Sequence, residues 1–305
     1  MERDYYDNEA FTVDYFAQYD STITNGEARI PICFCIDTSS SMNFITNKKG
    51  EYRVIENSSH TEDGIQNVIN VEPLPGVTLH HRIEEVQRVL IHMLDRMRYD
   101  KRISNAAVVS IVTFDMFADC IVEFSEINRI SPSTIYNIRT HEDKTNASKG
   151  IYMALERLDQ FRHLNSMAGN ESYKPVLVFM SDGDVNNDPE ASVASREVRE
   201  RSDAGKLNVI PIAIGGAADE TWMRRLSKDS HVYHMEHEEE FDRVFDIITR
   251  RIAKTAMVIS VDEGLRSKEE DEEISDSTND ESSTCYGTDT TDDDFMSFLN
   301  SFANS

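Results

Sequence analysis

The chain has 305 residues, a formal net charge of −25 at pH 7 and a hydrophobic content of 39%. Such a surplus of acids argues against binding to nucleic acid, which requires Lys and Arg to neutralise phosphates, and against docking on an anionic membrane surface. No run approaches the ~20 apolar residues of a membrane span, and the first residues contain no apolar signal region. We therefore expect a cytoplasmic protein.

The first 28 residues alternate acidic with aromatic side chains. Aromatic side chains gain free energy from burial, so this composition differs from that of a plain disordered segment. We expect an N-terminal arm, residues 1–28, that packs either on the body of the protein or on a partner.

A continuous apolar run follows at 30–37 and ends in a carboxylate and several hydroxyls. Such a run is typical of a buried parallel strand, and open α/β sheets bind ligands just beyond the carboxyl ends of their strands. Asp37, Ser39 and Ser41 form an Asp-x-Ser-x-Ser pattern there. These hard oxygen donors of low total charge suit Mg2+ or Mn2+ better than zinc. Capping of the next helix is the alternative interpretation.

The segment 43–80 is polar and contains a Pro-Leu-Pro-Gly break. A loop this long inside a compact domain is usually either functional or disordered. Because it leaves directly from the Asp-x-Ser-x-Ser motif, we expect an insertion that sets partner specificity. A tolerated surface insertion is the alternative.

Beyond this insertion, helical and strand patterns alternate. Apolar residues at helical spacing predict a core-facing helix over 79–98, and a buried strand at 106–114 is followed by an antiparallel partner at 116–124. The later elements are predicted as helices at 131–139 and 147–164, a strand at 175–181, a helix from 188, a strand at 207–214, a helix at 218–228, a strand at 231–235 and a helix at 238–254. This alternation predicts a doubly wound, mostly parallel six-stranded α/β sheet with one antiparallel edge strand.

Two further residues complete the candidate site. Thr145 precedes the helix at 147–164, which it could instead cap, and Asp182 follows the strand at 175–181. With the Asp-x-Ser-x-Ser motif, this order resembles a von Willebrand factor A (vWA) domain with its metal-ion-dependent adhesion site, over residues 29–255. The resemblance implies that Ser39, Ser41 and Thr145 supply hydroxyl ligands, while Asp37 and Asp182 act largely through bound waters.

One position departs from the family pattern. The family often has Gly between the two serines, where this chain has Ser40. If that position needs a positive φ, Ser40 adds a small strain.

A narrower resemblance lies within the family. The run Val71–Gly76 before an Arg-Ile-Glu-Glu-Val helix, and Val112-Thr113-Phe114, are similar to bacterial TerY-type domains. Those domains are cytoplasmic, are associated with tellurite resistance and stress, and are often encoded beside protein kinases and phosphatases. The resemblance implies a partner of that kind.

The four cysteines are Cys33, Cys35, Cys120 and Cys285. Cys33 and Cys35 lie two apart on one face of a strand and are poorly placed to bond each other. We expect reduced, mostly buried thiols.

The C-terminal part, residues 256–305, is rich in acids, Ser and Thr, and we expect a disordered tail. Within it, the short amphipathic segment 292–302 places four apolar residues on one helical face, namely Phe295, Phe298, Leu299 and Phe302. A helix this short is marginal alone, so we expect it to dock weakly in a groove of a partner or of its own domain.

The function that these features predict is metal-dependent protein recognition, without catalysis. An incoming Asp or Glu of a partner protein would complete the coordination of Mg2+ or Mn2+. Two alternatives stay open: a metal-dependent phosphoryl-transfer hydrolase, for which Asp37 and Asp184 are the candidate nucleophiles or bases, and a non-catalytic adaptor subunit of an ATPase complex.

Overall fold

The computed structural model describes residues 29–47, 50–60, 66–141, 145–170, 172–182, 188–215 and 220–235. The chain divides into two units, Met1–Ser260 and Val261–Ser305, and all described residues lie in the first. The predicted N-terminal arm, the helix at 238–254, the acidic tail and the motif formed by Phe295, Phe298, Leu299 and Phe302 lie outside the described residues.

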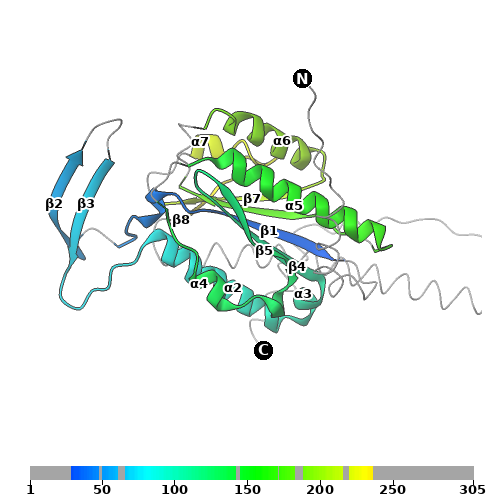
Figure 1. Ribbon diagram of the computed structural model, residues 1–305, viewed down its shortest axis with the longest axis horizontal. Coiled ribbons are helices and arrows are strands. Elements are labelled where there is room, and N and C mark those ends of the chain that lie inside the picture. The colour runs from blue at the N-terminus through cyan, green and yellow to red at the C-terminus, as the bar shows by residue number, and fades with distance from the viewer. Residues whose placement is uncertain are drawn as a thin grey trace, which may run out of the picture. The chain divides into compact units, whose positions relative to one another are not determined.

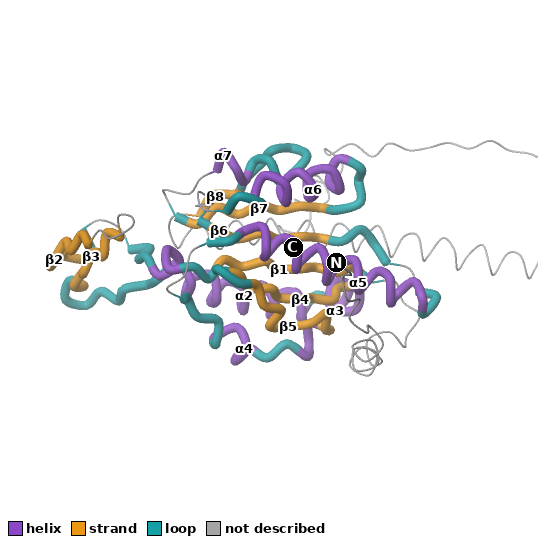
Figure 2. Tube along the Cα trace, turned by 45° about the horizontal axis from the view of Figure 1, so that its top comes forward, coloured by secondary structure: helices purple, strands orange, loops and turns teal. Residues whose placement is uncertain are grey.

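A six-stranded sheet forms the centre of the first unit, and its strands run in the order β5-β4-β1-β6-β7-β8 (Figure 2). Only β5 is antiparallel to its neighbour, so the predicted antiparallel edge strand is confirmed. The strands are β1 (Ile30–Asp37), β4 (Ala107–Phe114), β5 (Ala118–Glu126), β6 (Val176–Ser181), β7 (Asn208–Ile214) and β8 (Tyr233–Met235).

Helices cover both faces of this sheet (Figure 1). One face carries α2 (Arg82–Tyr99), α3 (Lys101–Ala106) and α4 (Pro132–Tyr136), and the other carries α5 (Ala147–Met167), α6 (Ala191–Asp203) and α7 (Glu220–Met223). The doubly wound α/β architecture expected from the sequence is therefore confirmed.

Strand β1 is buried on both faces because it lies between β4 and β6 at the centre of the sheet. Its alternate residues enter different cores. Ile32, Phe34 and Ile36 pack with the apolar stripe of α2, whereas Cys33 and Cys35 pack with α5 and α6. This two-sided burial explains why β1 reads as an unbroken apolar run.

The register brings the carboxyl ends of the central strands to one edge of the sheet. Asp37, the last residue of β1, pairs with Phe114, the last residue of β4. Ile36 pairs with Met180, one residue before the end of β6. Polar residues that follow these strands therefore meet at this edge, which we call the carboxyl edge.

The insertion is not the structureless loop that the sequence indicated. It contains an antiparallel hairpin of β2 (Tyr52–His60) and β3 (Gln66–Pro73), which pairs with no strand of the main sheet. The base of this hairpin is closed by hydrogen bonds from Leu74 N to Glu51 O, at 2.9 Å, and from Thr46 N to His80 O, at 2.8 Å. Its strands lack a regular alternation of apolar and polar residues, which is why the hairpin was not predicted.

Two smaller differences concern helices. The predicted helix at 218–228 is shorter in the structure, where α7 covers one turn, Glu220–Met223. The short helix α3, between α2 and β4, was not predicted. No helix in the described part of the chain combines the length and apolar character needed to cross a bilayer.

Candidate metal centre

Asp37 lies at the carboxyl edge and is fully buried. Both of its carboxylate oxygens accept a hydrogen bond: Oδ1 from the Ser39 backbone N–H at 2.9 Å, and Oδ2 from the Ser181 hydroxyl at 2.6 Å. Burial, and secondarily the nearby Asp182 carboxylate, raises the pKa of Asp37 from 3.8 to about 7. The arrangement fixes the carboxylate in place at a considerable desolvation cost.

The two serine hydroxyls of the motif lie together. Ser39 Oγ and Ser41 Oγ are 3.1 Å apart, at the start of the 3-10 helix η1 (Ser40–Asn43). Ser39 is the N-cap residue of η1, yet its side chain makes no capping hydrogen bond. Capping therefore does not account for the Ser39 hydroxyl. Ser40 is not among the described residues with a positive φ, so the expected strain at this position is absent.

Asp182 follows β6 and lies beside this cluster, with a side chain that is 6% exposed. Its Oδ2 accepts a hydrogen bond from Arg82 Nη1 at 3.2 Å. Its Oδ1 is buried and has no hydrogen-bond partner among the described residues. Buried polar atoms are nearly always paired, so an orphaned carboxylate oxygen in this position fits contact with a cation or a bound water.

Thr145 lies two residues before α5, and no hydrogen bond joins it to the other four candidate ligands in the described part of the chain. The N-cap of α5 is Asn146, whose side chain accepts from Lys149 N. Thr145 is therefore not the capping residue. Asn146 N donates to Asp115 O at 2.8 Å, which ties the start of α5 to the loop after β4.

These residues fit a hard divalent cation by their chemistry. The donor set consists of carboxylate and hydroxyl oxygens only. The described residues contain no cluster of three or more His, Cys, Asp or Glu groups that could hold a metal ion, so a cation here would depend on the hydroxyls. Together with the orphaned Oδ1, this composition supports the candidate site that the sequence predicted.

Sequence reasoning missed three residues around this edge. Arg82 forms an ion pair with Asp182. The sequence signal for a special role of Arg82 is its positive charge in the first turn of a helix, where the helix dipole favours acidic residues. The imidazole of His141 contacts the Asp115 carboxylate, and the backbone N–H of His141 donates to Thr38 O at 2.9 Å. Asp188 caps α5 from outside, because its Oδ2 accepts from Ser148 N at 2.6 Å. Nothing local in the sequence indicates that last contact.

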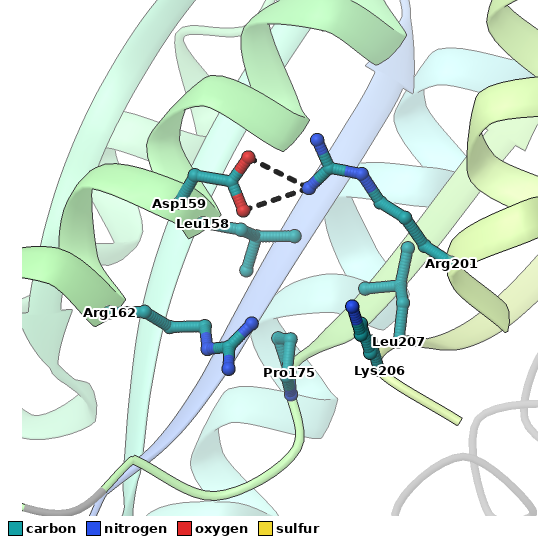
Figure 3. A pocket seen from close by; sticks show the side chains of 7 residues that line it. All are labelled: Leu158, Asp159, Arg162, Pro175, Arg201, Lys206 and Leu207. Carbon is teal, nitrogen blue, oxygen red and sulfur yellow. Dashed lines mark hydrogen bonds and ion pairs between the residues drawn. The ribbon is translucent and has the colours of Figure 1, made fainter. Parts of the chain in front are cut away.

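A depression of about 320 Å³ lies away from the candidate metal centre, at the opposite edge of the sheet, next to the starts of β6 and β7 (Figure 3). Its cationic rim is partly neutralised, because Arg201 Nη1 contacts both carboxylate oxygens of Asp159 at 2.8 Å. It is lined by Leu158, Asp159, Arg162, Pro175, Arg201, Lys206 and Leu207. Ligands of doubly wound sheets bind at the carboxyl edge, so this depression is the weaker candidate.

A doubly wound sheet whose central strand ends in paired hydroxyls and a buried carboxylate defines an α/β domain with a candidate cation site. The sequence model of the von Willebrand factor type A domain matches residues 78–249, more than half of the chain, so the chain belongs to this family. The match includes Thr145 and Asp182 but begins after the Asp-x-Ser-x-Ser motif. The structure places that motif at the end of β1 and in the turn that follows, and β1 lies between β4 and β6 of the matched part.

Solved structures with the same fold share little sequence with this chain. The PilB minor pilin from Streptococcus sanguinis is 14% identical with a TM-score of 0.50, over 75% of this chain and 62% of the pilin. A von Willebrand factor type A protein from Catenulispora acidiphila is 12% identical with a TM-score of 0.49, over 75% of this chain and 43% of that protein.

Proximal thread matrix protein 1 from the mussel byssus, with a zinc-occupied MIDAS motif, is 13% identical with a TM-score of 0.45, over 73% of this chain and 48% of that one. This chain thus spans roughly half the length of such structures, and the likeness concerns the fold alone. No curated protein sequence matches the chain.

Proposed function

We propose that the protein is a non-catalytic, metal-dependent protein-recognition module. The observation that carries this proposal is the orphaned, buried Oδ1 of Asp182 at the carboxyl edge. The other oxygen of this carboxylate is linked through Arg82 to the Ser41 carbonyl, in the loop that carries the two serine hydroxyls. In this proposal Ser39, Ser41 and Thr145 hold Mg2+ or Mn2+ through their hydroxyls, and Asp37 and Asp182 act largely through bound waters. A cation bound there would offer an open position to a carboxylate oxygen.

The charge balance at this edge supports a carboxylate ligand. Hydroxyls carry no charge, and one oxygen of Asp182 already faces a guanidinium. A divalent cation would therefore be under-neutralised, and the Asp or Glu of a partner protein would supply the missing negative charge. The predicted partner is a protein kinase, a phosphatase or an ATPase subunit in a cytoplasmic stress-response system similar to the TerY type.

Exposed apolar side chains beside the site would contact such a partner. Phe44, which follows η1, is 52% exposed, and Phe117, in the turn after β4, is 61% exposed. Large apolar side chains at this exposure are typical of interaction surfaces when they lie together around a polar centre.

A phosphoryl-transfer hydrolase is less well supported, because a nucleophile must reach the substrate. Asp37 is fully buried and both of its oxygens accept hydrogen bonds. Asp184, the other candidate, lies outside the described residues. No contact among the described residues favours catalysis over recognition.

The first test is direct metal binding by Thr145→Ala. We expect this variant to lose affinity for Mn2+ at least about tenfold, because it removes a hydroxyl ligand, without change in thermal stability in EDTA. Mn2+ binding is measured by electron paramagnetic resonance, with competition by Mg2+ and Zn2+. Thr134→Ala, on α4, is the matched control and should bind Mn2+ as the wild type does.

The same variants then enter pull-downs with Mg2+ or with EDTA. A protein retained by wild type and Thr134→Ala in Mg2+ alone supports metal-bridged recognition. Retention that is insensitive to both EDTA and Thr145→Ala would contradict the proposal, as would wild-type protein that fails to bind Mn2+ at millimolar concentration.

A further inference from the structure

Arg82 carries a positive charge into the candidate metal centre. It is the first residue of α2, and its side chain is 12% exposed. Nη1 lies 3.2 Å from Asp182 Oδ2 and 3.3 Å from the Ser41 carbonyl oxygen. The guanidinium thus contacts the loop after β1 and the residue that follows β6, both of which contribute candidate ligands.

The fold provides space for this guanidinium. Gly215, directly after β7, has a φ of +89°, and a Cβ there would lie 2.3 Å from Arg82 Nη2. The Phe44 ring covers another side, with its centroid 5.3 Å from the guanidinium carbon. Contacts from three segments, namely η1 with its C-cap Phe44, the residue after β6 and the residue after β7, hold the charge in one place. This distinguishes it from the half-exposed ion pairs along the helices.

A cation at the start of a helix is unfavourable with respect to the helix dipole. The Asp182 carboxylate compensates for this cost, because both side chains are largely buried, with exposed fractions of 12% for Arg82 and 6% for Asp182, and the pair is screened little by salt. Asp182 therefore has two uses at this edge. One oxygen faces Arg82, and the other is the buried, orphaned Oδ1 that is open to a cation.

We infer that Arg82 is a built-in competitor of the divalent cation: it shares Asp182 with the metal, keeps the metal affinity of the free protein low, and thereby couples metal binding to partner binding. This inference rests on the function proposed above. Two positive groups on one carboxylate repel each other, and a partner carboxylate that joins the metal offsets that repulsion. The metal should then bind weakly alone and more tightly together with the partner.

The test measures Mn2+ affinity of the free protein for wild type, Arg82→Gln and Arg88→Gln. Arg88 lies on the same helix and pairs with Glu85 at 3.0 Å, away from the candidate ligands. Both substitutions change the net charge equally, so Arg88→Gln controls for the overall charge of the protein. We expect Arg82→Gln to raise Mn2+ affinity on the order of tenfold, and Arg88→Gln to leave it unchanged. Because the pair is buried, the difference should persist at 0.5 M salt.

Arg82→Gln leaves a buried carboxylate without its cation, so its thermal stability in EDTA is measured first. If it does not fold, Gly215→Ala takes its place, since that substitution keeps every charge but occupies the space of the guanidinium. It should also raise Mn2+ affinity.

The outcomes separate the two proposals. Equal or lower affinity in Arg82→Gln than in Arg88→Gln, with Mn2+ binding intact in wild type, overturns the competitor role alone. Absence of Mn2+ binding in every variant overturns the proposed function and this inference with it.

Discussion

At the scale of single residues, the Asp37 carboxyl is the group most altered by the fold. Complete burial raises its pKa to about 7, with a further contribution from Asp182, although Ser181 and Ser39 donate hydrogen bonds that act in the opposite direction. Desolvation exceeds the hydrogen bonds here because the carboxylate has lost all contact with solvent. A divalent cation nearby would reverse this balance by favouring the ionised form.

This pKa gives a pH dependence with a definite sign. The folded-state pKa lies above the unfolded value, so the stabilising contribution of neutral Asp37 is complete below pH ~4 and is lost as pH rises to about 7. We expect this group to lower the melting temperature of metal-free protein across that range. Thermal melts in EDTA measure it, and Asp37→Asn should remove the dependence due to this site.

Metal affinity should change in the opposite direction. The cation requires the carboxylate form of Asp37, so binding releases a proton below pH 7. The Mn2+ affinity should therefore fall about tenfold per pH unit below that value, in the wild type but not in Asp37→Asn. An affinity independent of pH between 5 and 7 would rule out a role for this carboxylate.

At the scale of elements, the position of α5 depends on one glycine. A Cβ at Gly150 would lie 2.5 Å from the Phe114 ring and 2.9 Å from Phe114 Cβ, at the end of β4. The Phe114 ring has little freedom to move, because it stacks on Phe179 of β6 with ring centroids 5.3 Å apart. This close contact sets the distance between the start of α5, which follows Thr145, and the strands that end at the carboxyl edge.

Gly150→Ala should therefore destabilise the protein. The alanine gains about 1 kcal/mol of helix propensity, but overpacking typically costs about 1–3 kcal/mol. Because the Phe114 ring is held by stacking, we expect a cost near the upper end of that range and a net loss of up to about 2 kcal/mol. Urea unfolding in EDTA measures the free energy of unfolding. Ser166→Ala, at an exposed position of the same helix, is the control. A Gly150→Ala variant as stable as this control would show that α5 can move away from β4.

At the scale of the whole molecule, the described part consists of the sheet with its helices and a separate hairpin. Strands β2 and β3 pair only with each other, and Val54 and Ile55 on β2 are 52% and 65% exposed. A two-stranded hairpin is at most marginally stable by itself, so its base, where Asn47 Nδ2 contacts Thr78 O at 3.0 Å, holds it in place. In the sequence the hairpin lies between η1, which carries Ser41, and α2, which begins with Arg82.

Replacing residues 50–76 by a short Gly-Ser linker should leave folding and Mn2+ binding intact. None of the residues in that range whose burial the structure describes belongs to the two hydrophobic cores, so we expect the free energy of unfolding to change by less than about 1 kcal/mol. The variant should instead lose partner retention in the Mg2+ pull-down. Circular dichroism melts and Mn2+ titration check the first expectation, and full partner retention would contradict the assignment of specificity to the hairpin.

The sequence by itself determined the framework of this protein. The apolar runs that became β1 and β6, each with polar residues at its end, were readable because strands buried on both faces tolerate few polar side chains. Strand ends alone pointed to Asp37, Ser39, Ser41 and Asp182, since parallel strands bring their carboxyl ends to one edge. Thr145, which precedes a helix, was added by the resemblance to the vWA pattern.

Only the tertiary structure decided how the site is completed. The ion pair of Arg82 with Asp182 joins residues 100 positions apart, and the space at Gly215 comes from a third strand. The contact of Asp188 with Ser148 likewise joins the loop before α6 to the start of α5. Local sequence patterns record burial and periodicity, whereas contacts between distant side chains depend on how the packed elements meet. The candidate ligands could therefore be proposed from the sequence. The Arg82 guanidinium, which we infer to compete with the metal for Asp182, could not.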